Sequence, residues 1–167
     1  AAGMMAAVSV ARHGGQALVL EKMPALGRKM LITGKGRCNV TNECDIETFI
    51  RNMPGNGQFL YSCLHSFYNH DIMNFLAEWG VPTKVERGGR IFPVSDRAAD
   101  VVAAFSKAMK SVGVDVRTGE AVKEIIVESG AVAGVITKQD KSYSADAVII
   151  ACGGASYPGT GSSGDGY

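Results

Sequence analysis

The chain has 167 residues, 46% of them hydrophobic and 20% charged, which is long enough to bury the core of one globular domain. Its 17 basic and 16 acidic residues give a formal net charge of +1, which excludes a broad field for attracting nucleic acid or an anionic membrane. The longest apolar runs fall far short of the roughly 20 residues of a membrane span, and no signal peptide is expected. The default expectation is therefore a cytoplasmic protein that recognises a small-molecule substrate, with neither nucleic acid nor membrane as partner and with its oligomeric state open.

The sequence identifies no metal site and no catalytic acid or base. Its four cysteines (Cys38, Cys44, Cys63 and Cys152) form no C-x-x-C pair and have no histidine at zinc spacing, so free thiols are expected. His13, His65 and His70 form no constellation along the chain and are expected at helix ends. Catalytic residues therefore stay unassigned.

The first 21 residues follow the order of a dinucleotide-binding unit. A helix is predicted over 4–13 with Gly14-Gly15 as its stop, followed by an apolar strand over 16–21 that ends on Glu21. If Gly3 is the third glycine of G-x-G-x-x-G, the helix N-terminus faces a pyrophosphate and Glu21, 18 residues on, binds the adenosine ribose. The upstream strand and the first two glycines of the motif are absent, so the chain is expected to start inside the motif. For the same reason this motif alone does not decide whether the segment binds a dinucleotide.

The middle of the chain is predicted to be mainly helical. A helix is expected from Asp45 onward, then a turn at 54–57 and a long helical segment over 59–79. Its aromatic residues that follow a 3.6-residue period, Phe67, Phe75 and Trp79, are expected in the core rather than on a stacking surface. A hairpin over 83–94 turns at Gly88-Gly89, and a helix over 97–112, capped by Ser95 or Asp96, ends at Gly113.

The last third changes to the period of strands. Strands are predicted over 114–117, 121–128, 131–137 and 142–152, and the run 146–154 is expected to be a buried parallel strand that delivers backbone to a ligand. The glycine-rich residues 156–167 are either a flexible tail or a loop that contacts phosphate and cofactor. The predicted fold class is α/β, a Rossmann-like FAD/NAD(P)-binding domain with a parallel sheet plus a small antiparallel meander, truncated at both ends.

Several blocks carry a family resemblance. These blocks are Leu20-Glu21-Lys22, Gly27-Arg28-Lys29, Thr33-Gly-Lys-Gly-Arg-Cys-Asn-Val-Thr-Asn42, Gly89-Arg-Ile-Phe-Pro93 and Ala151-Cys-Gly-Gly-Ala-Ser-Tyr-Pro-Gly-Thr-Gly161. Through them the chain resembles the bacterial BaiN-like flavoproteins, FAD-dependent oxidoreductases that include bile-acid-type reductases and aminoacetone oxidase-like proteins. The resemblance implies a glutathione-reductase-like FAD domain, of which residues 1–167 are a partial copy without the first strand, the inserted domain and the C-terminal FAD segment.

The resemblance also implies a set of FAD contacts. Gly3 would lie against the pyrophosphate, Glu21 on the ribose, Val122 on the adenine edge through its backbone, and Asp165 on FAD, while Cys152 replaces the usual threonine of an Ala-Thr-Gly motif. The full set of implied cofactor-binding residues is Ala2, Gly3, Glu21, Lys22, Gly27, Arg28, Lys29, Thr33, Gly34, Arg37, Cys38, Asn39, Val122, Ala151, Cys152, Gly153, Gly154 and Asp165.

Each side chain in the glycine-rich loop also has a simpler interpretation. Arg37 or Lys35 would favour the negatively charged reduced flavin, or would be a solvated surface charge. Cys38 would be a redox thiol or, as we favour, a small buried hydrophobe. Asn39 and Asn42 would bind flavin carbonyls or stabilise a turn.

The leading hypothesis is a flavoprotein that transfers hydride to or from a small organic substrate such as an enone or an amine. NAD(P)H as a transient electron donor stays open, because no second dinucleotide fingerprint is present. The alternative is a nucleotide-binding module with a regulatory or RNA-modification role and no redox turnover of its own. A third hypothesis is that these residues alone bind no cofactor.

Overall fold

The computed structural model describes all residues 1–167, and the chain divides into two compact units. Unit 1 comprises residues 1–29 and 106–167, and unit 2 comprises residues 30–105. Unit 1 contains α1 (Ala2–Arg12), β1 (Leu18–Glu21), β5 (Asp115–Thr118), β6 (Val122–Glu128), β7 (Ala131–Thr137), β8 (Ser142–Ser144) and η3 (Pro158–Thr160). Unit 2 contains η1 (Thr33–Gly36), β2 (Thr41–Asn42), α3 (Ile46–Arg51), η2 (Gly57–Leu60), α4 (Tyr61–Ser66), α5 (Asn69–Glu78), β3 (Thr83–Glu86) and β4 (Arg90–Pro93). The chain passes between the units within α2 (Arg28–Ile32) and α6 (Ala98–Ser111).

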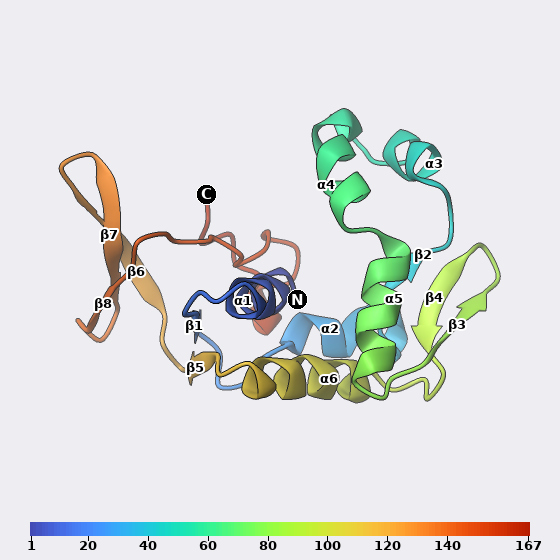
Figure 1. Ribbon diagram of the computed structural model, residues 1–167, viewed down its shortest axis with the longest axis horizontal. Helices are drawn as coiled ribbons and strands as arrows, with labels where there is room; N and C mark the ends of the chain where they lie inside the picture. Colours follow the sequence, from blue (N-terminus) through green and yellow to red (C-terminus); the bar gives the residue numbers. More distant parts are fainter. The chain divides into compact units, whose positions relative to one another are not determined.

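In unit 1, the helix and strand predicted at the start of the chain are both present (Figure 1). Helix α1 ends at Arg12 with His13 as its C-cap, and the next residue, Gly14, has a φ of +85°, which suits a residue without a Cβ. Strand β1 then pairs in parallel with β5, from Leu18 opposite Asp115 to Glu21 opposite Thr118. This parallel pair places the carboxyl ends of β1 and β5 at the same edge.

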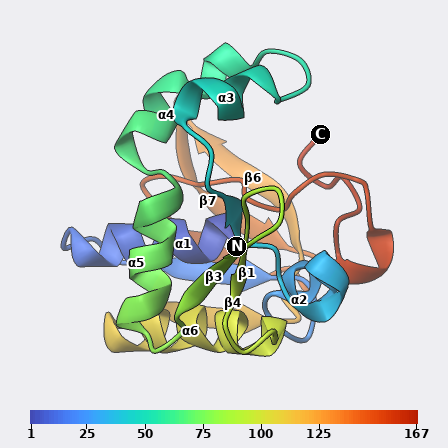
Figure 2. The same cartoon turned by 90° about the vertical axis from the view of Figure 1, so that its right-hand side faces the viewer.

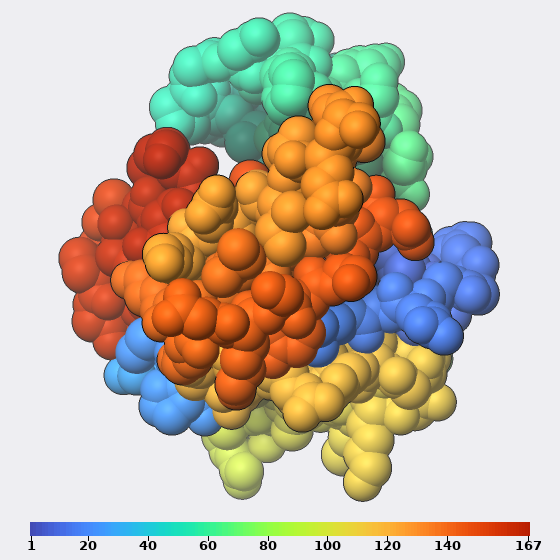
Figure 3. Space-filling view, turned by 90° about the vertical axis from the view of Figure 1, so that its left-hand side faces the viewer, coloured from blue at the N-terminus to red at the C-terminus, as the bar shows by residue number.

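The antiparallel meander is confirmed as the three-stranded sheet β6-β7-β8, whose atoms form the near face in Figure 3. Its first turn is Ser129-Gly130, with φ of +51° and +81°, as a tight hairpin requires. At Gly134 a Cβ would lie 2.2 Å from the carbonyl oxygen of Tyr143, so only glycine lets β7 approach β8 this closely.

The prediction of a parallel strand over 146–154 is wrong. The structure ends β8 at Ser144, and residues 145–154 form no ladder with β1 or β5, which pair only with each other. Ile149 and Ile150 are 63% and 60% exposed. An apolar run becomes a strand only where another strand satisfies its backbone, and no strand of the chain pairs with this run.

Unit 2 is built on the three-stranded antiparallel sheet β2-β4-β3. The predicted hairpin is confirmed, with β3 paired to β4 from Thr83 opposite Pro93 to Glu86 opposite Arg90. Ile91 and Phe92 of β4 are buried, and Phe75 of α5 packs on Phe105 of α6 with ring centroids 5.0 Å apart. The core of unit 2 therefore lies between its sheet and these two helices.

The long helical segment predicted over 59–79 is broken into η2, α4 and α5. Phe67 is extended, with φ −153° and ψ 113°, and Tyr68 caps α5 in a capping box with Asp71, so the chain changes direction there (Figure 2). Phe75 and Leu76 are in the core as predicted, but Phe67 is exposed. The prediction that Phe67 lies in the core is wrong, because the break separates it from the buried face of α5.

Across the described chain, no helix is both long enough and apolar enough to span a membrane.

Candidate functional site

The carboxyl edge of β1 and β5 carries the first group of predicted site residues. Glu21 ends β1, and its Oε1 accepts a hydrogen bond from the backbone N–H of Met23 at 2.9 Å. The backbone N–H of Glu120 donates to the carbonyl of Glu21 at 3.1 Å, which holds the connection from β5 to β6 beside the end of β1. The Glu21 carboxylate is therefore fixed at the edge where an open α/β sheet binds its ligand.

The first turn of α1 supplies the second feature. Ala1 caps the helix with no side-chain hydrogen bond, and the first N–H groups of a helix have no intrahelical partner. A Cβ on Gly3 would lie 3.2 Å from the Cβ of Ala151, so glycine here permits the segment that carries Ala151 to lie tightly against α1. This is the packing expected of the third glycine of a dinucleotide-binding fingerprint, and Ala2 lies in the same turn.

Three cations hold the glycine-rich segment of unit 1, which we define as residues 156–165. The Lys22 ammonium donates to the Ser163 hydroxyl and pairs with Asp165. Arg28 donates to the carbonyl of Gly159 at 3.2 Å, and Lys29 donates to the Ser156 hydroxyl at 2.8 Å. These contacts tie residues 156–165 to the residues that follow β1.

The hydrogen bond from Lys22 also lowers the pKa of the Asp165 carboxyl, so this group is ionised at neutral pH. Three predicted site residues, Lys22, Arg28 and Lys29, thus contact the segment that contains a fourth, Asp165.

The remaining predicted residues of unit 1 lie outside the regular helices and strands or at their ends. Gly27, before α2, and Gly153 have φ of +72° and +73°, a conformation that favours glycine. Cys152 and Gly154 lie in the irregular run after β8, and Cys152 is exposed. Val122 begins β6 opposite Thr137.

In unit 2, residues 33–39 form a strained loop that contains the second group of predicted site residues. Gly34, Lys35, Gly36 and Cys38 all have positive φ, of +55°, +59°, +85° and +63°. For residues other than glycine such a conformation costs on the order of 1–3 kcal/mol, and it persists only where the surroundings impose it. A Cβ on Gly34 would lie 2.8 Å from both the Asn39 nitrogen and a ring carbon of Phe92, so the loop lies directly on that ring.

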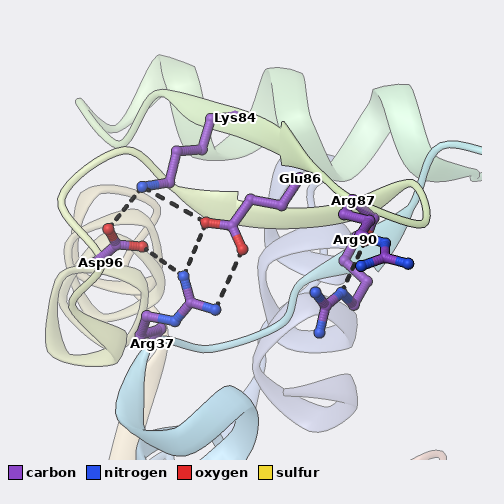
Figure 4. Close-up of polar contacts among 6 residues, drawn as sticks. All are labelled: Arg37, Lys84, Glu86, Arg87, Arg90 and Asp96. Carbon is purple, nitrogen blue, oxygen red and sulfur yellow. Dashed lines mark hydrogen bonds and ion pairs between the residues drawn. The ribbon is translucent and has the colours of Figure 1, made fainter.

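Arg37 extends from this loop into an ion cluster with Lys84, Glu86 and Asp96 (Figure 4). Its two terminal nitrogens meet the two oxygens of Glu86 at 2.8 and 3.2 Å, and one of them reaches Asp96 at 3.2 Å. Lys84 donates to Asp96 at 2.6 Å and lies 3.7 Å from Glu86. The Arg37 guanidinium also lies over the Phe92 ring, 4.1 Å from its centroid.

The cluster keeps its charged form across the physiological pH range. The hydrogen bond from Arg37 lowers the pKa of Glu86, and the hydrogen bond from Lys84 lowers the pKa of Asp96. The hydrogen bond to Glu86 in turn raises the pKa of Arg37. Two cations and two carboxylates thus compensate each other, which sequence analysis did not anticipate when it considered Arg37 as a donor to flavin.

Neighbouring side chains stabilise the loop itself. Cys38 is buried, and this burial raises the pKa of its thiol, in agreement with the favoured interpretation as a small hydrophobe. With its amide nitrogen toward them, Asn39 donates to the carbonyls of Thr41 at 3.2 Å and Ile91 at 3.3 Å. The Thr33 hydroxyl donates to the carbonyl of Met30 at 2.8 Å.

Sequence reasoning missed Lys84, Glu86 and Asp96 as partners of this loop. One signal was available: Lys84 and Glu86 are two residues apart on a predicted strand, so their side chains share one face. Asp96 was expected only as a helix cap. No group of three or more His, Cys, Asp or Glu side chains in the chain is placed to hold a metal ion.

Comparison with known proteins gives relatives for the whole chain. It is 36% identical over 170 residues to the 3-dehydro-bile acid delta(4,6)-reductase of Clostridium scindens, covering 100% of this chain and 40% of the relative. It is 28% identical over 170 residues to a ribosomal RNA dihydrouridine synthase of Haemophilus influenzae, covering 100% of this chain and 41% of the relative. The corresponding synthase of Escherichia coli is 27% identical over 168 residues, with coverages of 100% and 40%. The chain thus spans about two-fifths of the length of these relatives.

Two solved structures share the fold. The THI4 protein of Thermovibrio ammonificans superposes with a TM-score of 0.54 at 16% identity, over 81% of this chain and 43% of that one. An oxidoreductase from Methanosarcina mazei gives a TM-score of 0.51 at 14% identity, over 90% of this chain and 56% of that one. The family described as the HI0933-like protein Rossmann domain matches all of residues 1–167. The sequence match, the parallel pair β1–β5 and the glycine at the start of α1 lead to one conclusion: the chain belongs to the HI0933-like Rossmann family.

Proposed function

We propose that the chain is part of the FAD-binding domain of an oxidoreductase that transfers hydride to a small organic substrate. One observation carries the proposal: Glu21 ends a strand in parallel register with β5, and this strand follows a helix whose first turn holds Gly3 against Ala151. This is the arrangement that binds a dinucleotide with its ribose on the carboxylate and its pyrophosphate at the helix N-terminus.

The residues present fit the adenosine and pyrophosphate part of FAD. A Cβ at Gly3 would already be in contact with Ala151, and the first turn of α1 offers backbone N–H groups with no capping side chain. Glu21 would accept from the ribose hydroxyls, while the glycine-rich segment, held by Lys22, Arg28 and Lys29, would present Asp165. FAD, when bound, supplies the ring that accepts and donates hydride.

The names of the relatives narrow the reaction. A delta(4,6)-reductase and a dihydrouridine synthase both add two hydrogens across a carbon–carbon double bond, and both of those bonds are conjugated to a carbonyl group. The bile acid reductase has the higher identity, 36% against 28%. We therefore propose an enone of small-molecule size as the substrate class, with NAD(P)H as a transient electron donor.

A second candidate is reduction of uridine in ribosomal RNA, favoured by the two dihydrouridine synthases among the relatives. The formal net charge of +1 over these 167 residues provides no broad positive field for RNA, which argues against this candidate. Anaerobic oxidation of the reduced flavin by a steroid-type dienone and by unmodified ribosomal RNA, measured in parallel, separates the two candidates.

The test is an absorbance spectrum of the full natural chain carrying this sequence, with the released cofactor identified by mass. We expect bound FAD, and we expect Glu21→Ala to weaken its binding at least tenfold because the ribose hydroxyls lose their acceptor. Glu124→Ala, a change of the same type on β6, is the matched control and should leave binding unchanged. A colourless protein that does not take up added FAD would contradict the proposal.

A further inference from the structure

We propose that Glu120 is a specificity-determining residue of the nucleotide site: one of its carboxylate oxygens accepts a hydrogen bond from an N–H group on the base of the bound nucleotide. The proposal rests on the proposed function, because it takes the ribose of that nucleotide to lie at Glu21. Every residue that carries it belongs to unit 1.

Glu120 lies directly beside the strand that ends on Glu21. Strand β1 pairs with β5 and with no other strand, and β5 leads through Gly119 and Glu120 toward β6 (Figure 1). The backbone N–H of Glu120 donates to the carbonyl of Glu21 at 3.1 Å, and that of Gly119 donates to the carbonyl of Met23 at 3.1 Å. A nucleotide with its pyrophosphate at α1 and its ribose at Glu21 continues with its base along the carboxyl edge of the sheet. The residues that follow β5 lie at that edge.

The side chain of Glu120 is a buried carboxylate with one oxygen that accepts no hydrogen bond. Glu120 is 8% exposed, and its Oε1 pairs with the Lys141 ammonium. Its Oε2 is buried and has no hydrogen-bond partner. A buried polar group without a partner is costly, and such a group in a native protein calls for an explanation. Because a carboxylate oxygen only accepts, the partner that Oε2 requires is a donor.

The turn between β7 and β8, residues 138–141, holds Glu120 in place. Lys141 supplies the ion pair, and the Gln139 side chain donates to the carbonyl of Gly119 at 3.1 Å. Lys141 is 57% exposed, so the ion pair joins the buried carboxylate to the surface of the unit. A carboxylate that is fixed at one oxygen and unpaired at the other is preorganised to accept one hydrogen bond.

The base that fits this acceptor is one that carries an N–H donor at its edge. Adenine, the base of FAD, has an exocyclic amino group that donates. Hypoxanthine has a carbonyl oxygen, which is an acceptor, at the same position. A carboxylate oxygen attracts the amino group and repels the carbonyl oxygen, so a site that reads this edge of the base discriminates between the two.

The experiment measures how tightly the full natural chain binds FAD and the FAD analogue in which hypoxanthine replaces adenine. Both ligands carry the same flavin, so one optical signal reports both affinities. We expect FAD to bind at least tenfold more tightly than the analogue, because the analogue leaves Oε2 facing a second acceptor. Equal affinities would overturn the proposal.

Glu120→Gln gives the sharper result, because the Lys141 ammonium has donors and no acceptor. The glutamine oxygen therefore faces Lys141, and the amide NH2 group takes the position of Oε2. We expect this variant to bind the analogue at least as tightly as FAD, a tenfold or larger change in the ratio of the two affinities. Glu124→Gln, the same change on β6, is the matched control and should keep the wild-type ratio. An unchanged ratio in Glu120→Gln at unchanged Tm would overturn the role of Glu120.

Glu120→Asp keeps the proposal testable if Glu120→Gln does not fold. It retains the negative charge that faces Lys141 but is shorter by one methylene, so the oxygen is withdrawn from the base. The affinity ratio should then fall toward one. A purely structural role of Glu120 predicts instead that both affinities fall together and that the ratio stays at its wild-type value.

Failure of the proposed function has its own outcome. If the wild-type chain takes up neither FAD nor the analogue, the proposed function and the role of Glu120 both fail. If it binds the two equally well, the proposed function stands and only the role of Glu120 fails.

Discussion

Thiol exposure differs sharply among the four cysteines. Cys63 and Cys152 are exposed, whereas Cys38 is buried and this burial raises the pKa of its thiol. Because the thiolate is the reactive form, we expect Cys38 to react with a thiol reagent at pH 8 at least tenfold more slowly than Cys63 or Cys152. Mass spectrometry of timed labelling would measure this difference, with the unfolded protein, in which all four thiols react alike, as control. Equal rates in the folded protein would contradict the buried position.

The Tyr68 hydroxyl donates to the carbonyl of Cys44 at 2.7 Å. Its burial, together with the contact of its hydroxyl with the Cys44 thiol at 3.8 Å, raises the pKa of Tyr68 to about 12, against a usual value of about 10. The stabilisation from a raised pKa is fully present below the unfolded value and is lost as pH rises toward the folded one. We therefore expect the free energy of unfolding to fall between pH 10 and 12, and Tyr68→Phe to flatten this fall. The measurement is the free energy of unfolding from denaturant titrations at several pH values across that range. If this free energy fell equally with pH in the wild type and in Tyr68→Phe, the expectation would be contradicted.

At this scale, sequence patterns predicted the chemistry of single residues better than their partners. Cys38 is buried, as we favoured. Asn39, for which a turn role and a flavin contact were both left open, donates to backbone carbonyls. The pairing of Arg37 with Glu86 joins residues 49 positions apart, and no local pattern specifies such a contact. An unpaired arginine and a fully compensated one look the same in a sequence.

Among the elements, the glycine-rich segment over residues 156–165 depends on cations from the other end of the chain. Lys22 binds both Ser163 and Asp165, so we expect Lys22→Met to release the segment and to speed its amide hydrogen exchange. Exchange in β6 and β7 should be unchanged, and Lys123→Met on β6 serves as a control of the same type. If amide exchange in residues 156–165 were equally fast in Lys22→Met and in the wild type, Arg28 and Lys29 would suffice to hold the segment.

The two wrong predictions, the unbroken helix over 59–79 and the strand over 146–154, have a common physical origin. A period of 3.6 residues continues through Phe67, but the Tyr68–Asp71 capping box starts a new helix there. The apolar run over 146–154 has the composition of a buried strand, yet no strand of the chain pairs with it. The periodicity of apolar residues indicates which face of a helix or strand is buried. The point where a helix breaks depends on local capping residues, and strand pairing depends on partners that are distant in sequence. The elements whose partners are near in sequence, such as β3–β4 and β6–β7, agree with prediction.

For the whole molecule, the division into two units has a direct test. The single tryptophan, Trp79, lies at the end of α5 in unit 2, so its fluorescence reports that unit. Leu76 in unit 2 and Met4 in unit 1 are both buried, and replacing either with alanine is expected to cost about 2–5 kcal/mol. We expect Leu76→Ala to shift the fluorescence transition in denaturant and Met4→Ala to shift mainly the far-UV circular dichroism. Equal shifts of both signals in both variants would mean that the units unfold together.

The parallel pairing of β1 with β5 also has a consequence for synthesis of the chain. Leu18 pairs with Asp115, roughly a hundred residues later, and all of unit 2 lies between them. On the ribosome, unit 2 therefore emerges complete before β5 exists, and it is able to fold while β1 still has no neighbour. The edge that carries Glu21 is consequently assembled late, by closing a long loop around a unit that is already folded.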